Sequence, residues 1–177
     1  MVRTGPSTGF APIAGANSTV LILGSLPGRM SLARAEYYAL PRNAFWRICG
    51  DLFGLGAEVP YAERRRGLIE ARIALWDVCG SARRAGSLDA AIESDSIVVN
   101  DFAGFLGAHS KIRLICFNGV KAWELYRRRV LPELPPTLAA IRTIRLPSTS
   151  PAHAGMPYAQ KLALWSVIRV SVERHSA

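Results

Sequence analysis

The chain has 177 residues, half of them hydrophobic and a fifth charged, with 22 Lys and Arg against 13 Asp and Glu. This length fits one domain, and the composition excludes a disordered chain. No apolar run approaches the roughly 20 residues of a membrane-spanning helix, and the N-terminus lacks the pattern of a secretory signal. We therefore expect a cytoplasmic protein with one domain over residues 19–177, preceded by a loose, Gly- and Pro-containing lead-in over residues 1–18.

The net charge of +9 comes almost entirely from arginine, since only Lys111, Lys121 and Lys161 are lysines. Such an excess on a small domain favours a polyanionic partner, nucleic acid first. An Arg-rich composition that reflects a GC-rich genome is the alternative. The Arg runs at 64–66 and 127–129 can equally be solvated helix faces.

The cysteines and histidines give no sign of a metal site. The cysteines are widely spaced and form no C-x-x-C pair, which fits reduced thiols in a cytosolic protein. The histidines add no ligand spacing, so we expect neither a structural zinc nor an iron–sulfur cluster, and no cofactor. These residues are Cys49, Cys79, Cys116, His109, His153 and His175.

Apolar runs and helical periodicity alternate along the chain. The runs at 19–24, 71–78, 112–117 and 141–146 predict buried strands. Helices are predicted at 45–53 and 61–70 after the first strand, at 89–92 and 101–108 after the second, and at 120–130 after the third. One long helix at 158–174 closes the chain. This alternation predicts an α/β fold, a parallel sheet with helices on both faces.

In such folds, ligands bind beyond the carboxyl ends of the strands. That rule selects four segments: Gly24–Gly28, Asp77–Arg84, Phe117–Gly119 and Pro147–Ala154.

The segment that follows the first strand combines a tight turn with aromatic side chains. Gly24 and Gly28 allow close backbone approach to a ligand, but the Gly-Lys-Ser/Thr end of a phosphate loop is missing. The stretch YYALPRNAFW over residues 37–46 suits a flat heterocycle, held by stacking and by edge hydrogen bonds. Inward packing of Phe45 and Trp46 at the start of a helix is the alternative.

The segment that follows the last strand, LPSTSPAHAG over residues 146–155, is rich in hydroxyls. Ser148, Thr149 and Ser150 are able to donate to phosphate oxygens. His153 lies among small residues in a part of the loop that can project, although a lone His is often only a surface or capping residue.

These motifs resemble the uracil-DNA glycosylase superfamily, most closely its family 6 branch, the hypoxanthine-DNA glycosylases. The resemblance runs from about Val20 to Trp165 and rests on GSLPG, YYALPRNAFW, ALWDVCGSARRAGSLDAAI, CFNG and LPSTSPAHA. It implies a three-layer α/β/α sandwich around a four-stranded parallel sheet. It also implies a monomer without metal or cofactor, acting on DNA that contains a deaminated base, uracil or hypoxanthine. The base is flipped into a pocket and its N-glycosidic bond is hydrolysed, which leaves an abasic site in base excision repair.

The resemblance predicts which residue positions the attacking water, although the chain differs from the family at one position of this segment. Mismatch-specific members carry an Asn in the turn after the first strand, and the best-known uracil enzymes carry an Asp there, whereas this chain has Leu26. Asn43 resembles the Asn that family 6 uses further along the segment, so we expect it to orient water or contact the base. A cap for a helix that begins at Ala44 is the alternative.

Three more residues are expected around the base. Tyr38 matches the aromatic position that stacks on it, Asp77 ends the second strand where the best-known enzymes read the base edge with an Asn, and Asn118 is a second edge reader. A carboxylate at Asp77 accepts a base N–H but repels the developing negative charge unless burial keeps it protonated. A cap for the loop that follows is the alternative for Asp77.

The loop after the last strand matches the segment that enters the duplex when the base leaves. Ser148 stands where the best-known enzymes have an electrophilic His, so that group is missing unless His153 reaches in. These losses motivate the alternative function, a catalytically inactive DNA-binding module that senses damage.

The expected site has three groups of residues. Catalytic residues are Asn43, Asp77 and His153; base-contacting residues are Gly24, Ser25, Leu26, Pro27, Gly28, Tyr38, Phe45 and Asn118; DNA-contacting residues are Arg42, Arg83, Arg84, Ser148, Thr149, Ser150 and Ala152.

Overall fold

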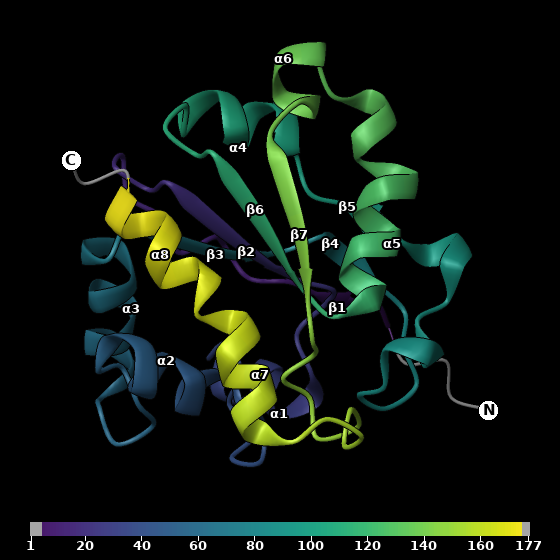
Figure 1. The fold of residues 1–177 in the computed structure, drawn as a ribbon. Helices are drawn as coiled ribbons and strands as arrows, with labels where there is room; N and C mark the ends of the chain where they lie inside the picture. The colour runs from purple at the N-terminus through teal and green to yellow at the C-terminus, as the bar shows by residue number, and fades with distance from the viewer. Residues whose placement is uncertain (1–4, 175–177) are drawn as a thin grey trace.

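The computed structural model describes residues 5–174, and its centre is a sheet of four parallel strands (Figure 1). The strand order is β3-β2-β6-β7, and all neighbouring strands run parallel. Gly24 pairs with Asp77, and Asn118 pairs with Leu146, so the carboxyl ends of the strands meet at one edge. The strands are β2 (Val20–Gly24), β3 (Ile73–Asp77), β6 (Leu114–Asn118) and β7 (Arg142–Leu146).

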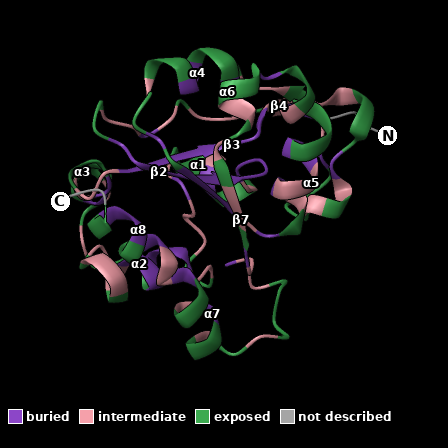
Figure 2. Ribbon diagram, turned by 45° about the horizontal axis from the view of Figure 1, so that its top comes forward, coloured by how far each residue is buried: buried purple, intermediate pink, exposed green. Residues whose placement is uncertain are grey.

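Helices cover both faces of this sheet, because its strands carry apolar side chains on both sides. In β2, Leu21 and Leu23 belong to one core, whereas Val20 and Ile22 belong to the other. The predicted three-layer α/β/α sandwich is thus confirmed, and Figure 2 shows the buried strands β2 and β3 between helices that are only partly exposed. The first core includes α4 (Phe102–Ala108) and α5 (Val120–Arg129); the second includes α2 (Phe45–Phe53), α3 (Tyr61–Glu70), α7 (Tyr158–Trp165) and α8 (Val167–Arg174).

The predicted closing helix is wrong in one respect, because it is broken into α7 and α8 at Ser166. The Ser166 hydroxyl donates a hydrogen bond to the Ala163 carbonyl, at 2.7 Å, and such back-bonding weakens the continuation of a helix. A short helix, α1 (Arg29–Arg34), follows the turn after β2 and was not predicted.

A second, antiparallel sheet of three short strands, in the order β1-β4-β5, lies beside the main one. The strands are β1 (Ser7–Thr8), β4 (Cys79–Ala82) and β5 (Val98–Val99). Ile13 is buried and bridges Leu75 of β3, so the segment expected to be a loose lead-in is hydrogen-bonded to the core where the structure describes it.

The remaining elements are short. The helix predicted at 89–92 is a single 3₁₀ turn, and the one predicted at 120–130 ends one residue earlier. Across residues 5–174, none of the helices has the length and apolarity to cross a bilayer. These short elements are η1 (Asp89–Ala91), η2 (Ser94–Ser96), η3 (Leu131–Glu133) and α6 (Pro136–Ala139).

Candidate active site

The carboxyl edge of the main sheet brings the predicted polar residues together. A Cβ atom added to Gly24 would lie 2.9 Å from the Tyr38 hydroxyl and would overlap Oδ1 of Asp77. Glycine at position 24 therefore lets both side chains lie against the end of β2. The backbone continues this cluster, since the Val78 N–H donates to the Gly24 carbonyl at 2.9 Å.

Asp77 is a buried carboxyl group, with 4% of its surface exposed. Its Oδ2 atom has no hydrogen-bond partner among residues 5–174. Burial, and then the negative charge of Asp89, raise the pKa of Asp77 to about 7, while Arg84 lowers it. Near neutral pH this group therefore exists in both forms, one that accepts a hydrogen bond and one that donates it. Oδ2 therefore caps no backbone N–H among the described residues, in contrast to the capping alternative considered above.

The Tyr38 side chain lies beside this carboxyl group at the end of β2 and stacks on a second aromatic ring. Tyr38 stacks on Phe45 with ring centroids 4.1 Å apart and an interplanar angle of 21°. Phe45 is fully buried, and its ring meets Trp46 and Trp165 edge to face. Inward packing of Phe45 and Trp46, the alternative to a binding role, is thus what the free protein shows.

Asn118 and Thr149 connect two of the strand-end segments. The Asn118 amide donates to the Thr149 hydroxyl at 2.8 Å and accepts from the Thr149 N–H at 2.9 Å. The Thr149 carbonyl in turn accepts from the Ala44 N–H at 2.9 Å. Thr149 is 1% exposed, so it holds the loop after β7 to the end of β6 rather than facing DNA as predicted.

Asn43 lies directly before α2, and its side chain has a local partner. Its Oδ1 accepts from the Phe45 N–H at 3.0 Å, which is an Asx-type turn at the helix start. The helix begins at Phe45 rather than at Ala44, with Ala44 as its cap residue. The capping alternative is therefore present, but it uses only the oxygen of the amide and leaves the NH₂ group for another partner.

A buried arginine holds the Gly24–Gly28 turn through hydrogen bonds to two of its carbonyls. Arg84 donates to the Leu26 carbonyl at 3.3 Å and to the Pro27 carbonyl, and its side chain is 1% exposed. Arg84 therefore supports the turn, and the predicted DNA contact is wrong for this residue because its guanidinium is enclosed. The Leu26 side chain packs in the core, so only its backbone borders the turn.

Asp89 joins this support, although it was not among the predicted site residues. It accepts a hydrogen bond from the Ser25 hydroxyl at 2.6 Å and lies 3.7 Å from Arg84. Gly28 ends the turn as the cap of α1, and the next N–H, that of Arg29, donates to Ser87. The signal for Asp89 in the sequence was its place in the motif ALWDVCGSARRAGSLDAAI, which carries part of the family resemblance.

A cavity of about 200 Å³ opens beside the loop that follows β7, lined by several cationic side chains. The buried Lys161 donates to the His153 carbonyl at 2.7 Å and thereby fixes the loop. Arg47, which lies over the Tyr158 ring, and Lys161 were not predicted, because periodicity alone does not tell which helix face borders a loop. The cationic residues that line the cavity are Arg42, Arg47 and Lys161, and His153 also borders it.

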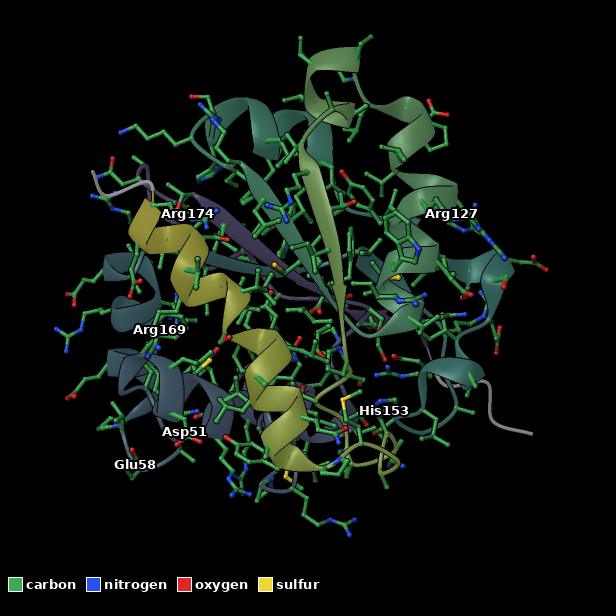
Figure 3. The ribbon with its side chains drawn as sticks, viewed as in Figure 1. Asp51, Glu58, Arg127, His153, Arg169 and Arg174 are labelled. Atoms are coloured by element: carbon green, nitrogen blue, oxygen red, sulfur yellow. The ribbon has the colours of Figure 1, made fainter. Side chains whose placement is uncertain are left out.

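The other predicted DNA contacts are divided between exposed and paired positions. His153 and Ala152 are exposed at the loop, where Figure 3 labels His153, and no printed contact joins His153 to Asp77 or Asn118. Ser148 and Ser150 are half-buried, and each hydroxyl accepts a backbone N–H two residues further on. Arg83 is ion-paired with Glu93 at 2.8 Å.

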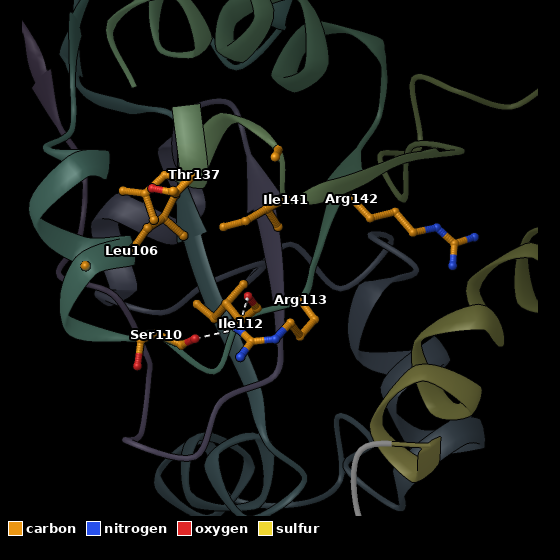
Figure 4. A pocket seen from close by; sticks show the side chains of 10 residues that line it. Leu106, Ser110, Ile112, Arg113, Thr137, Ile141 and Arg142 are labelled. Atoms are coloured by element: carbon orange, nitrogen blue, oxygen red, sulfur yellow. Dashed lines mark hydrogen bonds between the residues drawn. The ribbon is translucent and has the colours of Figure 1, made fainter. Parts of the chain in front are cut away.

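A larger cavity, of about 540 Å³, lies at the opposite edge of the sheet (Figure 4). It is bordered by Leu106, Ile112 and Ile141, and the Arg113 guanidinium donates to the carbonyls of Ser110 and Ile112. This cavity contains none of the predicted site residues. Among the described residues, no group of three or more His, Cys, Asp or Glu side chains is arranged to hold a metal ion.

Comparison with known proteins agrees with this geometry. Residues 12–169 match the family model of the uracil DNA glycosylase superfamily. A hypoxanthine DNA glycosylase of Methanosarcina acetivorans is 40% identical over 133 residues, 70% of this chain and 83% of that protein. One of Methanosarcina barkeri is 37% identical over 66% of this chain and 73% of that protein. A solution NMR structure of a candidate uracil DNA glycosylase from M. acetivorans, 34% identical, superposes with a TM-score of 0.77 and covers 94% of this chain and 99% of its own.

Proposed function

Because the chain belongs to the uracil-DNA glycosylase superfamily, we propose that it is a DNA glycosylase that removes deaminated bases, hypoxanthine first and uracil second. The observation that carries this proposal is the buried Asp77 carboxyl with an unpartnered oxygen, beside the stacked Tyr38 and Phe45 rings. The names of the relatives support hypoxanthine as the preferred base.

The reaction breaks the bond between the base nitrogen and C1′ of the sugar, with the electron pair leaving on the base. A water oxygen bonds to C1′, and its proton passes to the departing base or to solvent. Negative charge develops on the base oxygen, where protonated Asp77 donates a hydrogen bond, so that repulsion is avoided. In its ionised form the same carboxyl accepts the base N–H, which fits the N1–H of hypoxanthine and the N3–H of uracil.

Water positioning is the proposed role of Asn43. Its oxygen is held by the Phe45 N–H, which fixes the plane of the amide. The NH₂ group is then free to donate to a water molecule from a defined direction. Leu26 cannot take this role, because its side chain is in the core.

DNA contact is proposed for the cationic cavity beside the loop that follows β7. Arg42 and Arg47 are exposed and line this cavity together with Lys161, so a phosphate placed there would neutralise part of their positive charge. Ser150, Ala152 and His153 form the proposed segment that enters the duplex as the base leaves. We propose a monomer that works in the cytoplasm on DNA.

Oligonucleotides that each contain one hypoxanthine, one uracil or only normal bases test the activity. The expected result is an alkali-labile abasic site from the hypoxanthine strand, a slower yield from uracil, and none from the normal strand. Release of neither base would refute the proposal. Tight binding to the hypoxanthine strand without product would favour the damage-sensing module instead. That alternative was suggested by Leu26, which stands where relatives have an Asn or an Asp.

Salt dependence tests the DNA-contacting surface separately. The logarithm of the binding constant should fall linearly with the logarithm of salt concentration, with a slope of about −0.9 for each phosphate neutralised. Arg42→Ala and Arg47→Ala should each reduce this slope by about 1. Arg127→Ala is the matched control, since Arg127 is exposed on α5, away from the labelled His153 (Figure 3). An unchanged slope in both cavity variants would exclude this surface.

A further inference from the structure

We propose that Leu88 is a wedge residue, whose side chain inserts into the base stack of the duplex beside the nucleotide that is flipped out. This inference rests on the proposed function, because it takes the Gly24–Gly28 turn as part of the edge that faces DNA. It adds a second point of entry into the duplex to the loop that follows β7.

The loop that follows β7 lacks a large apolar side chain at its exposed part. Residues 150–155 are Ser, Pro, Ala, His, Ala and Gly, and the next residue is Met156. Pro151 and Met156 are half-buried. Proteins that unstack a base step insert an apolar side chain into it, and a long aliphatic chain fills the space of an extruded base better than alanine does. A large apolar wedge would therefore have to come from another segment at the same edge.

The loop over residues 84–92 offers such a side chain in a fixed place. Its two ends pair, since Arg84 and Ile92 form an antiparallel bridge and both are buried. Residues 85–88, which are Ala, Gly, Ser and Leu, are all exposed. Leu88 is the large apolar residue among these four, and 61% of its surface is exposed. The loop thus presents one leucine to solvent.

The residues on either side of Leu88 are bound to the segment that follows β2. Ser87 Oγ accepts a hydrogen bond from the Arg29 N–H at 3.2 Å. Asp89 accepts from the Ser25 hydroxyl at 2.6 Å. Leu88 itself is extended, with a φ of −79° and a ψ of 134°, so its side chain points away from those of its two neighbours. Leu88 therefore faces outward beside the turn, where duplex DNA has to lie if a flipped base is to reach the site.

A second exposed apolar side chain lies close by. Met30 follows Arg29, whose N–H donates to Ser87, and 39% of the Met30 surface is exposed. Single exposed aliphatic residues are common on protein surfaces. Here, however, Met30 and Leu88 follow the two residues that one hydrogen bond joins, at the edge where the base binds. Apolar surface that the free protein leaves in water gains free energy when a base stack covers it, which offsets part of the cost of flipping.

Binding to duplex and to single-stranded DNA separates insertion from other roles of Leu88. Both DNAs carry one hypoxanthine nucleotide with a 2′-fluoro group, which withdraws electrons from the sugar and so slows release of the base. Fluorescence anisotropy at one salt concentration gives the dissociation constants. Leu88→Ala should weaken duplex binding by about tenfold, because the buried aliphatic surface is lost. Binding to the single strand should change by less than about twofold, since it has no paired stack for a wedge to hold open.

Two further variants control for size and for apolar surface elsewhere. Leu88→Met keeps a side chain of similar length and apolarity, so its duplex affinity should stay within about threefold of wild type. Leu164→Ala is the matched control, because Leu164 is exposed on α7 and does not line the cationic cavity. It should bind both DNAs as wild type does. All three variants should melt close to the wild-type temperature, since both leucines are exposed.

Equal duplex binding by wild-type protein and Leu88→Ala, or none by either, would overturn the inference. An equal loss of affinity for duplex and single strand would also overturn it, as would a loss in Leu164→Ala as large as that in Leu88→Ala. None of these constants requires release of the base. Failure to release hypoxanthine therefore refutes the proposed function, whereas the ratio of duplex to single-strand affinity decides the role of Leu88.

Discussion

The two edges of the main sheet differ in what they leave unsatisfied. The amino edge has the larger cavity, about 540 Å³, whose lining includes apolar side chains and Arg113, and Nη1 of Arg113 donates to two backbone carbonyls. The carboxyl edge lacks so large a cavity in the free protein, yet it collects buried polar atoms without partners. Among residues 5–174, such atoms include Oδ2 of Asp77 and Nε of Arg84, both close to the Gly24–Gly28 turn.

This difference teaches that an empty volume is a weaker sign of function than an unpaired buried group. The apolar atoms that line a cavity need no hydrogen-bond partner. An unpartnered carboxyl group in the core, in contrast, lowers the stability of the folded protein. A carboxyl group of this kind is retained when the function of the protein requires it. The predictions below change one edge at a time and compare the outcomes.

The largest effect is expected from Asp77→Ala. Removal of this carboxyl group takes away both the donor to the leaving base and the acceptor of its N–H, so single-turnover release of hypoxanthine should slow by ~10²–10⁴-fold. Asp101→Ala is the control, because Asp101 is an exposed carboxylate that caps α4 at Gly104. A rate for Asp77→Ala within fivefold of the wild-type rate would show that the carboxyl edge is not the site.

The second effect concerns stability and pH. Asp77 has a folded pKa of about 7, raised from an ordinary value of 3.8. Between about pH 4 and 7 the unfolded chain releases a proton that the folded protein keeps, so the free energy of unfolding falls as the pH rises, and the loss is complete above pH 7. Asp77→Asn should remove this loss, with a stabilisation on the order of 4 kcal/mol at pH 8 and little change near pH 3.5.

Denaturant titrations of both proteins at these two pH values measure that difference. Asp89→Asn is an informative companion, because loss of its negative charge should lower the pKa of Asp77 and move the transition to lower pH. The same stability gain for Asp77→Asn at pH 3.5 and pH 8 would contradict a raised pKa.

A third, smaller effect is expected from the Asn118–Thr149 connection. Thr149→Val keeps the side-chain shape but removes the hydroxyl that accepts from Asn118. The unfolding free energy should fall by about 1 kcal/mol, because the half-buried Asn118 donor loses this partner. Base release should slow as well, because the loop after β7 is then held less firmly, and its Thr149 backbone carbonyl accepts from the Ala44 N–H beside Asn43.

Thr137→Val, the same substitution at the exposed border of the amino-edge cavity, is the matched control. It should change neither rate nor stability appreciably. Equal effects of the two Thr→Val changes on base release would remove the argument that the connection at the carboxyl edge matters for the site.

The sequence predicted the four parallel strands and the bounds of α2 and α3, because continuous apolar runs and 3.6-residue periodicity reflect burial directly. The two-residue strands β1 and β5 are too short for any period to appear. The predicted site segments did meet at one edge, since parallel strands place their carboxyl ends together. The roles of the residues at this edge are proposals, which the Asp77 and Thr149 variants test.

Patterns in the sequence did not predict the directions in which individual side chains point. Arg84 has the charge of a DNA contact, but the carbonyls of Leu26 and Pro27 face inward and need a donor, which draws its guanidinium into the interior. Thr149 has the hydroxyl of a phosphate contact, but it is enclosed by its pairing with Asn118. Partners distant in the sequence decide these directions, and composition does not contain that information.

The smallest effect should come from the amino edge, where Gly107 of α4 borders the large cavity. A Cβ at this position would meet nothing within 4 Å. Gly107→Ala should therefore raise the unfolding free energy by about 0.5–1 kcal/mol through the lower entropy of the unfolded chain. The melting temperature should rise by roughly 1–4 °C, with no change in base release.

Gly104→Ala on the same helix is the matched control with the opposite sign. Its Cβ would overlap the Asp101 carboxylate that accepts from the Gly104 N–H, so the cap of α4 would be lost at a cost of about 1 kcal/mol. Both variants should release hypoxanthine at the wild-type rate, because both lie in α4 and neither contacts the carboxyl edge. Slower release by Gly107→Ala would assign a function to the large cavity, and the contrast between the two edges would then fail.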